Sequence, residues 1–329
     1  MSRERLAELV RLRIFGKSPV NAYLRLNELL WKALPSSLTA LRPLRSYGHF
    51  LNELVRLSAK RRQFFGTFFL RNRPELELIR RLSIQKDKGS TLRIAVLGCS
   101  NGAEVYSILW TLRHGCPHVI PLITAVDIST AALQLAQKGS YNLDAPELVQ
   151  ERIFDRLTTQ ELRDMFDREE DQVRIKPWIK EGIVWHLADA ADPELVRLLG
   201  PQDMVVASNF LCHMHPRDAE RCLRNISGLV RSGGYLFVSG VDLDVRTRVA
   251  KDLSWKPIRE LLEEIHNGDP VLRRDWPFAW WGLEPINRRR QDWQLRYAAA
   301  FQLGSGAALA YVDAIASAPL EAPGCSCLQ

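Results

Sequence analysis

Two short stretches of the sequence combine small residues with acidic ones in a pattern that suits a nucleotide-like ligand. The first, "GCSNGAE", supplies Gly98, Cys99, Ser100, Asn101 and Glu104. The second, "AVDIS", ends an apolar run at Asp127 and Ile128. A glycine-containing turn before a helix lets backbone amides approach a ligand. A carboxylate that closes the next strand can accept hydrogen bonds from both hydroxyls of a ribose.

The first stretch also matches the G-x-S-x-G pattern of a hydrolase nucleophile elbow, with Ser100 in the position of the nucleophile. An elbow stands on an already built sheet, so several strands and an oxyanion loop precede it. Here "GCSNG" follows the first strand of the pattern. We therefore interpret Ser100 as a loop residue of a ligand site.

Strands and helices alternate around these stretches. Residues 92–98 form a continuous apolar run that ends at a glycine, and residues 101–115 follow with helical periodicity. A second strand ends at Asp127, and a second helix ends at Gly139. Strands at 183–192, 203–214 and 234–243 and a helix at 218–230 continue the alternation, which favours a mostly parallel α/β sheet. The segment 245–270 is expected to be helical, and a last strand is expected from Trp293.

The charge of the first stretch narrows the choice of ligand. The dinucleotide fingerprint G-x-G-x-x-G requires glycine at position 100 and glycine or alanine at position 103. Only Ala103 meets this requirement. Glu104, in the first helical turn, would repel a pyrophosphate but attract an ammonium or a sulfonium. The pattern therefore favours a cationic cofactor, S-adenosylmethionine.

The net charge of +7 conceals an uneven distribution. Residues 1–90 carry +12 and the rest of the chain −5, and the basic part shows apolar residues at helical spacing. This region is either a docking site for an acidic protein surface or a solvated helical face. It lacks the alternation of aromatic and basic residues that stacks bases, so we expect no nucleic-acid partner.

No apolar stretch approaches the ~20 residues that cross a bilayer, and the charged N-terminus does not resemble a secretory signal. We therefore expect no membrane insertion and a cytoplasmic location. The six cysteines include no C-x-x-C pair, which favours reduced thiols.

Four ordered motifs resemble those of CheR-type methyltransferases, which esterify glutamate side chains of bacterial chemotaxis receptors. "GCSNGAEVYSI" resembles the family's "GCSTGEEPYSL", and "AVDISTAALQLAQKGSYN" resembles "ATDIDxxxLxxAxxGxY". "TFFLRN" is similar to "TxFFRD/N", and "SNFLCHM" to "RNVLIYF". The resemblance extends from about Phe64 to Ser239. It implies a class I, Rossmann-like methyltransferase fold with a mostly parallel seven-stranded sheet, preceded by a small all-helical domain.

The resemblance also implies residue roles. It puts the backbone of residues 98–101 around the methionine part of S-adenosylmethionine and Glu104 on its amino group. Asp127 falls on the ribose, Ile128 beside the adenine, Asp189 and Ala190 near the adenine amino edge, and Asn209 near the amino-acid end. Arg71 falls on the family's arginine and would orient a carboxylate acceptor. Two of these have plain alternatives, because Asp189 can cap the following helix and Arg71 can be a surface arginine.

Departures from the family pattern lie on the acceptor side. His213 replaces a tyrosine, Ser208 an arginine and Ala103 a glutamate. His213 is an orienting or packing residue if the acceptor is a carboxylate, and a general base if it is a hydroxyl or amine. One metal ion does not suit Cys212, His213 and His215, because successive residues at the end of a strand point to opposite sides. The Trp-rich segment "RRDWPFAWWGLEP" is either a lid over the acceptor site or core packing for the C-terminal helices.

These observations predict three regions. They are a basic helical domain over residues 1–90, an S-adenosylmethionine-binding methyltransferase domain over 91–304 with an extension from about 255, and a flexible tail over 305–329. Three functions remain open: a protein-glutamate O-methyltransferase, a methyltransferase for a small-molecule hydroxyl or amine, and a non-catalytic cofactor-binding signalling module.

Overall fold

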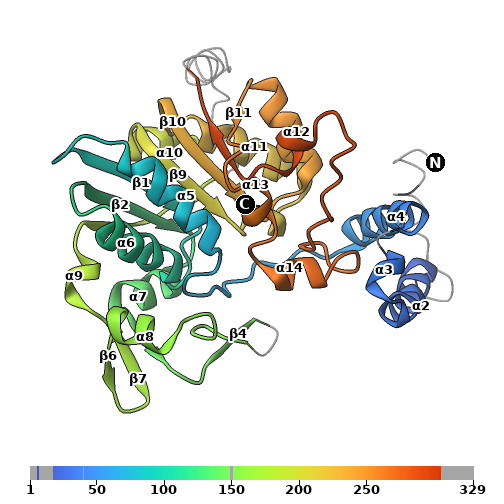
Figure 1. Ribbon diagram of the computed structural model, residues 1–329, viewed down its shortest axis with the longest axis horizontal. Coiled ribbons are helices and arrows are strands. Elements are labelled where there is room, and N and C mark those ends of the chain that lie inside the picture. The colour runs from blue at the N-terminus through green and yellow to red at the C-terminus, as the bar shows by residue number, and fades with distance from the viewer. Residues whose placement is uncertain (1–5, 7–17, 40, 149–150, 305–329) are drawn as a thin grey trace, which may run out of the picture.

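The computed structural model describes residues 6, 18–39, 41–148 and 151–304, so the predicted tail lies outside the described residues. Its centre is a seven-stranded sheet in the order β11-β12-β10-β9-β1-β2-β8 (Figure 1). The strands are β1 (Thr91–Leu97), β2 (Ile120–Asp127), β8 (Ile183–Leu187), β9 (Gln202–Ser208), β10 (Val230–Ser239), β11 (Lys256–Pro257) and β12 (Ala300–Gln302). The five strands from β8 to β10 pair in parallel, and β12 runs antiparallel to both of its neighbours. The predicted mostly parallel sheet is confirmed.

The strand order places a crevice at the end of β1. β1 lies between β2 and β9, so the chain leaves β1 in one direction along the sheet and later returns to its other side. Open α/β sheets bind ligands outside the carboxyl ends of strands at such a switch point. The loops after β1, β2 and β9 carry most of the predicted cofactor residues.

Helices cover both faces of the sheet because strand side chains alternate between them. Ile94 and Val96 of β1 pack on one face with α5 (Arg73–Ile84) and α6 (Ala103–Gly115). Ala95 and Leu97 pack on the other face with α10 (Glu194–Leu199), α11 (Pro216–Ser227) and α12 (Leu243–Asp252). A further helix, α7 (Thr130–Lys138), follows β2 and ends at Gly139, whose φ of 60° suits a left-handed C-cap.

The N-terminal helices form a separate group beside the sheet (Figure 1). They are α2 (Pro19–Ala33), α3 (Ser36–Thr39) and α4 (Arg42–Ser58). The next helix, α5, belongs instead to the sheet core, where Leu78 and Ile79 are buried. We therefore propose a domain boundary near residue 59, where α4 ends, in place of the boundary at residue 90 that charge and periodicity suggested.

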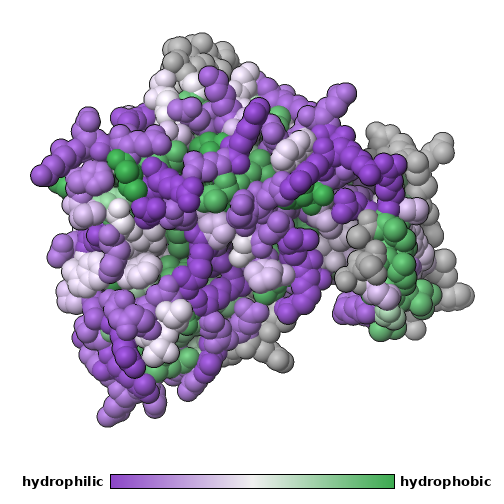
Figure 2. Space-filling view, in the orientation of Figure 1, coloured by the Kyte–Doolittle hydropathy of each residue, from purple (hydrophilic) through white to green (hydrophobic). Residues whose placement is uncertain are grey.

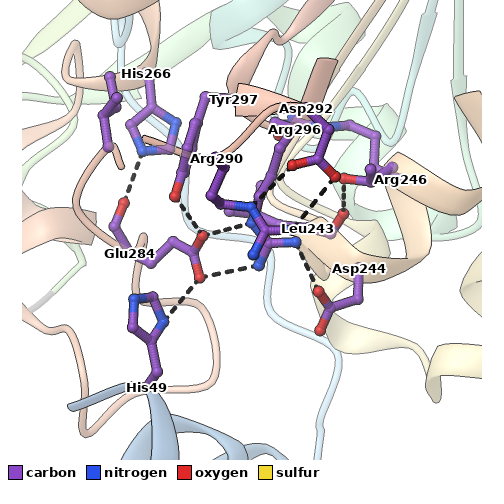
Figure 3. A network of polar contacts seen from close by, with 12 residues as sticks. His49, Leu243, Asp244, Arg246, His266, Glu284, Arg290, Asp292, Arg296 and Tyr297 are labelled. Carbon is purple, nitrogen blue, oxygen red and sulfur yellow. Dashed lines mark hydrogen bonds and ion pairs between the residues drawn. The ribbon is translucent and has the colours of Figure 1, made fainter. Parts of the chain in front are cut away.

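The Trp-rich segment joins the N-terminal helices to the sheet domain. The Trp276 ring packs edge-on against Trp31 of α2, and the Asn52 side chain of α4 donates to the Pro277 and Ala279 carbonyls. His49 of α4 contacts the Glu284 carboxylate, which also binds the Arg296 guanidinium (Figure 3). The segment thus contacts the N-terminal helices as well as the C-terminal ones.

Ion pairs account for part of the uneven charge of the chain. Arg56 and Arg61, at the end of α4 and in the linker after it, both pair with the buried Asp242. Arg73 pairs with Glu161, and Lys86 with Asp203. Several basic residues before residue 90 therefore neutralise carboxylates of the sheet domain.

Helix α2 has a different surface from the one predicted. Figure 2 shows hydrophobic side chains gathered over the N-terminal helices. On α2, Leu26, Leu29 and Leu30 are largely exposed, and none of its described residues is buried. The surface of α2 is thus largely apolar, with Arg25 beside a Glu28–Lys32 ion pair.

Two predictions about the C-terminal part were wrong in detail. The segment 245–270 contains two helices, α12 and α13 (Leu262–His266), with β11 between them, because Lys256 and Pro257 pair with β12 at the sheet edge. The run from Trp293 begins with a helix, α15 (Trp293–Tyr297), and only Ala300–Gln302 form the strand. A short helix α14 (Pro270–Arg274) lies between α13 and α15 in the chain.

An insertion between α7 and β8 was not foreseen. It contains two small antiparallel sheets, one of β3 (Ser140–Asn142), β6 (Phe166–Glu169) and β7 (Gln172–Ile175) and one of β4 (Pro146–Leu148) and β5 (Glu151–Arg152). It also holds helices α8 (Thr159–Met165) and α9 (Pro177–Lys180). Among the described residues, no helix is long and apolar enough to span a bilayer.

Candidate functional site

A cavity of about 320 Å³ opens at the carboxyl ends of β1, β2 and β9. Its lining includes eleven of the twelve residues that the sequence singled out: Arg71, Gly98, Cys99, Ser100, Glu104, Asp127, Ile128, Asp189, Ala190, Asn209 and His213. The twelfth, Asn101, belongs to the loop after β1 but does not line the cavity, and its side chain accepts a hydrogen bond from the Ala103 N–H. The fold therefore brings distant motifs to one place.

The loop after β1 depends on small residues. Gly98 has a φ of 67°, and a Cβ there would lie 2.8 Å from the Phe210 ring. Glycine is thus required both by conformation and by the close approach of this aromatic side chain. The Ser100 hydroxyl donates to the Phe65 carbonyl of the linker. That bond fixes the linker over the loop and gives Ser100 a structural role rather than a nucleophilic one.

Asp127 holds the loop and faces the cavity. One of its carboxylate oxygens accepts the Ser100 N–H at 2.8 Å, and the other accepts the Ser129 N–H at 2.9 Å. Each oxygen retains a further lone pair, since a carboxylate can accept about four hydrogen bonds. The side chain is buried and oriented, so it can receive the two hydroxyls of a ribose without rearrangement.

The predicted adenine region combines the exposed apolar Ile128 with Asp189 and the buried Ala190. Ile128 lines the cavity although 54% of its surface is exposed, which is the geometry of a side chain that covers a ligand. Asp189 accepts the Ala191 N–H at 2.8 Å and so makes a local turn. It does not cap the next helix, because Asp192 accepts the Glu194 N–H there.

Two carboxyl groups meet at the other end of the loop. Glu104 stands in the first turn of α6, and Glu75 of α5 also lines the cavity. The Ser208 hydroxyl donates to Oε1 of Glu75 at 3.4 Å, and its proximity to Glu104 opposes the rise in the pKa of that residue. Burial raises the pKa of Glu104 to about 7, and burial together with the nearby Glu104 raises the pKa of Glu75 to about 8.

Arg71 is anchored by a residue of the C-terminal extension. Its Nε lies 2.8 Å from a carboxylate oxygen of Asp269, whose other oxygen lies 3.0 Å from Arg156. The Arg156 guanidinium also stacks over the Phe68 ring, 4.2 Å from its centroid. The two guanidinium groups lower the pKa of Asp269 against the effect of its burial. Arg156 also lies 3.5 Å from a carboxylate oxygen of Glu151, so the two arginines face two carboxylates.

His213 occupies the short 3-10 helix η1 (Leu211–His213) after β9. Its Nδ1 is buried and has no hydrogen-bond partner. Burial lowers the pKa of this imidazole against the opposing effect of the Arg62 backbone, which favours the neutral ring. Its neighbour in sequence, His215, instead caps α11. Within the part of the chain that the structure describes, no group of three His, Cys, Asp or Glu side chains could hold a metal ion.

Comparison with known proteins agrees with this geometry. The model of the CheR methyltransferase S-adenosylmethionine-binding domain matches residues 66–247, more than half of the chain. The chain belongs to the CheR methyltransferase family. The matched region contains all twelve predicted site residues and ends within α12, the helix that follows β10. The predicted α/β class I fold and the cofactor, S-adenosylmethionine, are thereby confirmed.

Individual relatives are distant. The chain is 29% identical over 190 residues to a Rhodobacter capsulatus protein described as an uncharacterized 104.1 kDa protein in the hypE 3' region, a match that covers 54% of this chain and 19% of that protein. It is 25% identical over 175 residues to a chemotaxis protein methyltransferase of Listeria innocua serovar 6a, covering 52% and 63%. The matches thus span less than two thirds of these relatives.

Solved structures give partial matches. One is a magnesium protoporphyrin IX methyltransferase from Synechocystis PCC 6803, with 15% identity, a TM-score of 0.33, and coverage of 56% of this chain and 71% of that one. Another is an N-methyltransferase from Bradyrhizobium japonicum WM9, with 16% identity, a TM-score of 0.32, and coverage of 57% and 76%. The family assignment rests on the sequence match.

The lining of the cavity fits S-adenosylmethionine, the cofactor that the matched CheR domain binds. The cofactor presents an ammonium, a sulfonium and a ribose diol. Glu75 has a buried oxygen, Oε2, without a hydrogen-bond partner, and Asp127 has two oriented carboxylate oxygens. Acidic acceptors therefore stand at both ends of the loop after β1, where a cationic nucleoside needs them.

Sequence reasoning missed Glu75, Asp269 and Arg156. Glu75 lies three residues after Asn72, whose side chain accepts the Glu75 N–H and caps α5. A glutamate at that place in a helix is usually a capping residue, so the sequence gives no sign that this glutamate lines a cavity. Asp269 and Arg156 come from the extension and the insertion, and no motif marks either of them.

Proposed function

We propose that this chain transfers the methyl group of S-adenosylmethionine to a carboxylate, forming a methyl ester on a protein glutamate side chain. The observation that carries this proposal is the anchored guanidinium of Arg71. Its Nε is held by Asp269, and no partner among the described residues occupies its two terminal nitrogens. A planar guanidinium with two free nitrogens matches a carboxylate in a bidentate way.

The cofactor supplies an activated methyl group when it is bound. The chain's own residues then have three tasks. Asp127 orients the ribose, and Glu104 holds the amino group, so that the methyl points toward the acceptor side of the cavity. Arg71 aligns the acceptor carboxylate, which is already nucleophilic and needs no base. Alignment and exclusion of water account for most of the rate in such a displacement.

The charge of Arg71 itself supports an anionic acceptor. Asp269 divides its two carboxylate oxygens between Arg71 and Arg156, and Arg156 also pairs with Glu151 at 3.5 Å. The Arg71 guanidinium attracts a carboxylate acceptor, whereas it repels an ammonium. The exposed apolar surface of α2 is the part of the chain that we propose for docking an acceptor protein.

A hydroxyl or amine acceptor is the second candidate, and His213 is the observation that favours it. Its buried Nδ1 has no partner and is available to accept a proton. In that case the imidazole must reach the acceptor proton directly or through one water.

Transfer of labelled methyl groups from S-adenosylmethionine to a cell extract tests the proposal. We expect label on protein that is released by mild base, as an ester is. Arg71→Lys should lose most of the transfer rate with S-adenosylhomocysteine affinity unchanged, because an ammonium cannot reproduce the bidentate contact. Base-stable label, or label on small molecules alone, would favour the second candidate. Cofactor binding without any transfer would favour a signalling module.

A further inference from the structure

Glu75 is a buried acid that the proposed function leaves without a task. It is 5% exposed, it lines the cavity, and its Oε2 has no hydrogen-bond partner. Leaving a buried carboxylate oxygen unpaired is costly, so such a group marks a place where a ligand completes the site.

Ser208 lies beside both Glu75 and Glu104. Its hydroxyl donates to Oε1 of Glu75 at 3.4 Å, and its proximity opposes the rise in the pKa of Glu104. A hydroxyl has one proton and can donate to only one acid at a time. It therefore cannot satisfy both carboxylates, and a proton on one of them relieves their repulsion.

No cation offsets the two acids directly. Within the described part of the chain, neither Glu75 nor Glu104 forms an ion pair. The charged groups that face Glu75 are Glu104 from α6, Arg71 from the turn before α5, and Arg246 from α12. Arg71 is paired with Asp269, and Arg246 donates to the Val238 and Arg296 carbonyls. Glu75 and Glu104 therefore form a binding site for one compact cation.

We propose that Glu75 and Glu104 form one receptor that holds a proton when the cavity lacks cofactor and exchanges it for the α-ammonium of S-adenosylmethionine. The O–H bond of the protonated acid breaks, its proton leaves to solvent, and the ammonium donates hydrogen bonds to both carboxylates. No electrons are transferred. This inference rests on the proposed use of S-adenosylmethionine, and it adds Glu75 as a positioning residue for the cofactor.

The exchange gives binding a pH dependence with a defined sign. Ionised acids bind the ammonium, so affinity should increase as pH rises through the range in which the pair loses its proton. Burial raises the pKa values of Glu104 and Glu75 to about 7 and about 8, which places that range around neutrality. An exposed glutamate would complete its titration near pH 5 and would give no such dependence.

Calorimetry with S-adenosylhomocysteine, which carries the same ammonium, tests the exchange. Titrations at pH 7 in buffers of different ionisation enthalpy give the number of protons released. We expect the unmodified protein to release close to one proton more than Glu75→Gln. The two proteins should bind with similar affinity at pH 6, and the unmodified protein should bind about tenfold more tightly at pH 8.

Glu77→Gln is the matched control because Glu77 lies on the same helix but pairs with Arg80 and Arg81 outside the cavity. This variant should release as many protons as the unmodified protein. A second measurement needs no variant. Methylthioadenosine has the nucleoside and the thioether but lacks the amino-acid part and its α-ammonium, so its binding to the unmodified protein should release almost no protons.

Three results would overturn the exchange. They are equal proton release by Glu75→Gln and the unmodified protein, equal release with methylthioadenosine and S-adenosylhomocysteine, and affinity that is flat between pH 6 and 8. Failure of the unmodified protein to bind S-adenosylhomocysteine at any pH would refute the proposed function as well, so the two failures are distinguishable.

Discussion

Replacing Glu75 by glutamine should stabilise the cofactor-free protein at pH 8 and leave its stability nearly unchanged at pH 5. Glutamine has the shape of the protonated acid and does not titrate. The Glu75 side chain is almost fully buried, and its pKa is raised from 4.5 to about 8. Between these two values the folded protein binds more protons than the unfolded chain, so the stability of the unmodified protein falls as pH rises.

The magnitude follows from the width of that window. Each unit of pKa difference corresponds to about 1.4 kcal/mol, so a window of about 3.5 units gives an upper limit of roughly 5 kcal/mol at pH 8. Hydrogen bonding to Ser208 and the fields of Arg71 and Arg246 already act within this shift. We expect a gain for Glu75→Gln on the order of 3 to 5 kcal/mol at pH 8, with about half of it present by pH 6.

Urea unfolding followed by circular dichroism at pH 5, 6, 7 and 8 measures this gain. Glu77→Gln is again the control, because Arg80 and Arg81 lower the pKa of Glu77 to about 2 and keep it ionised throughout the range. Its effect on stability should be the same at every pH. A difference between Glu75→Gln and the unmodified protein that is equal at pH 5 and pH 8 would refute the reasoning, as would a variant that is less stable at pH 8.

Three further predictions concern the rest of the site. Asp127→Ala should weaken S-adenosylhomocysteine binding in calorimetry by roughly 1.5 to 3 kcal/mol, the contribution of hydrogen bonds to a charged group, and unchanged affinity would remove Asp127 from the ribose site. Asp269→Asn should lower the methyl-transfer rate about tenfold or more and the free energy of unfolding by roughly 3 kcal/mol, because Arg71 and Arg156 lose their shared carboxylate; an equal loss of cofactor affinity would contradict this. With a carboxylate acceptor, the single-turnover rate of the unmodified protein should be nearly flat above pH 7, whereas a log-linear rise from pH 6 to 7.5 that His213→Tyr abolishes would show that His213 is a base.

Local sequence patterns determined the centre of the molecule. The apolar run before Gly98 and the Asp that closes the next run predicted β1, β2 and the loop between β1 and α6. They succeeded because a buried parallel strand and a glycine turn are specified by residues adjacent in the chain. The same patterns predicted that Glu104 and Asp127 line one cavity, since carboxyl ends of neighbouring parallel strands share an edge.

The tertiary structure decided which elements the helices join. The amphipathic pattern of α5 requires an apolar partner but does not specify one, so charge grouped it with the N-terminal helices, whereas packing places it in the sheet core. Net charge also could not show that Arg56 and Arg61 neutralise Asp242 within the same chain. Ion pairs between distant segments have no sequence spacing from which to predict them.

The cofactor end of the site is easier to predict from the sequence than the acceptor end, again because contacts between distant segments have no sequence spacing. Glu104 follows the loop directly, but its partner Glu75 reaches the cavity from α5, and Asp269 reaches Arg71 from far along the chain. The sequence by itself therefore determined the donor side, which short-range geometry builds. Only the tertiary structure decided the second carboxyl group and the anchored guanidinium, because each depends on side chains that folding alone brings within hydrogen-bond distance.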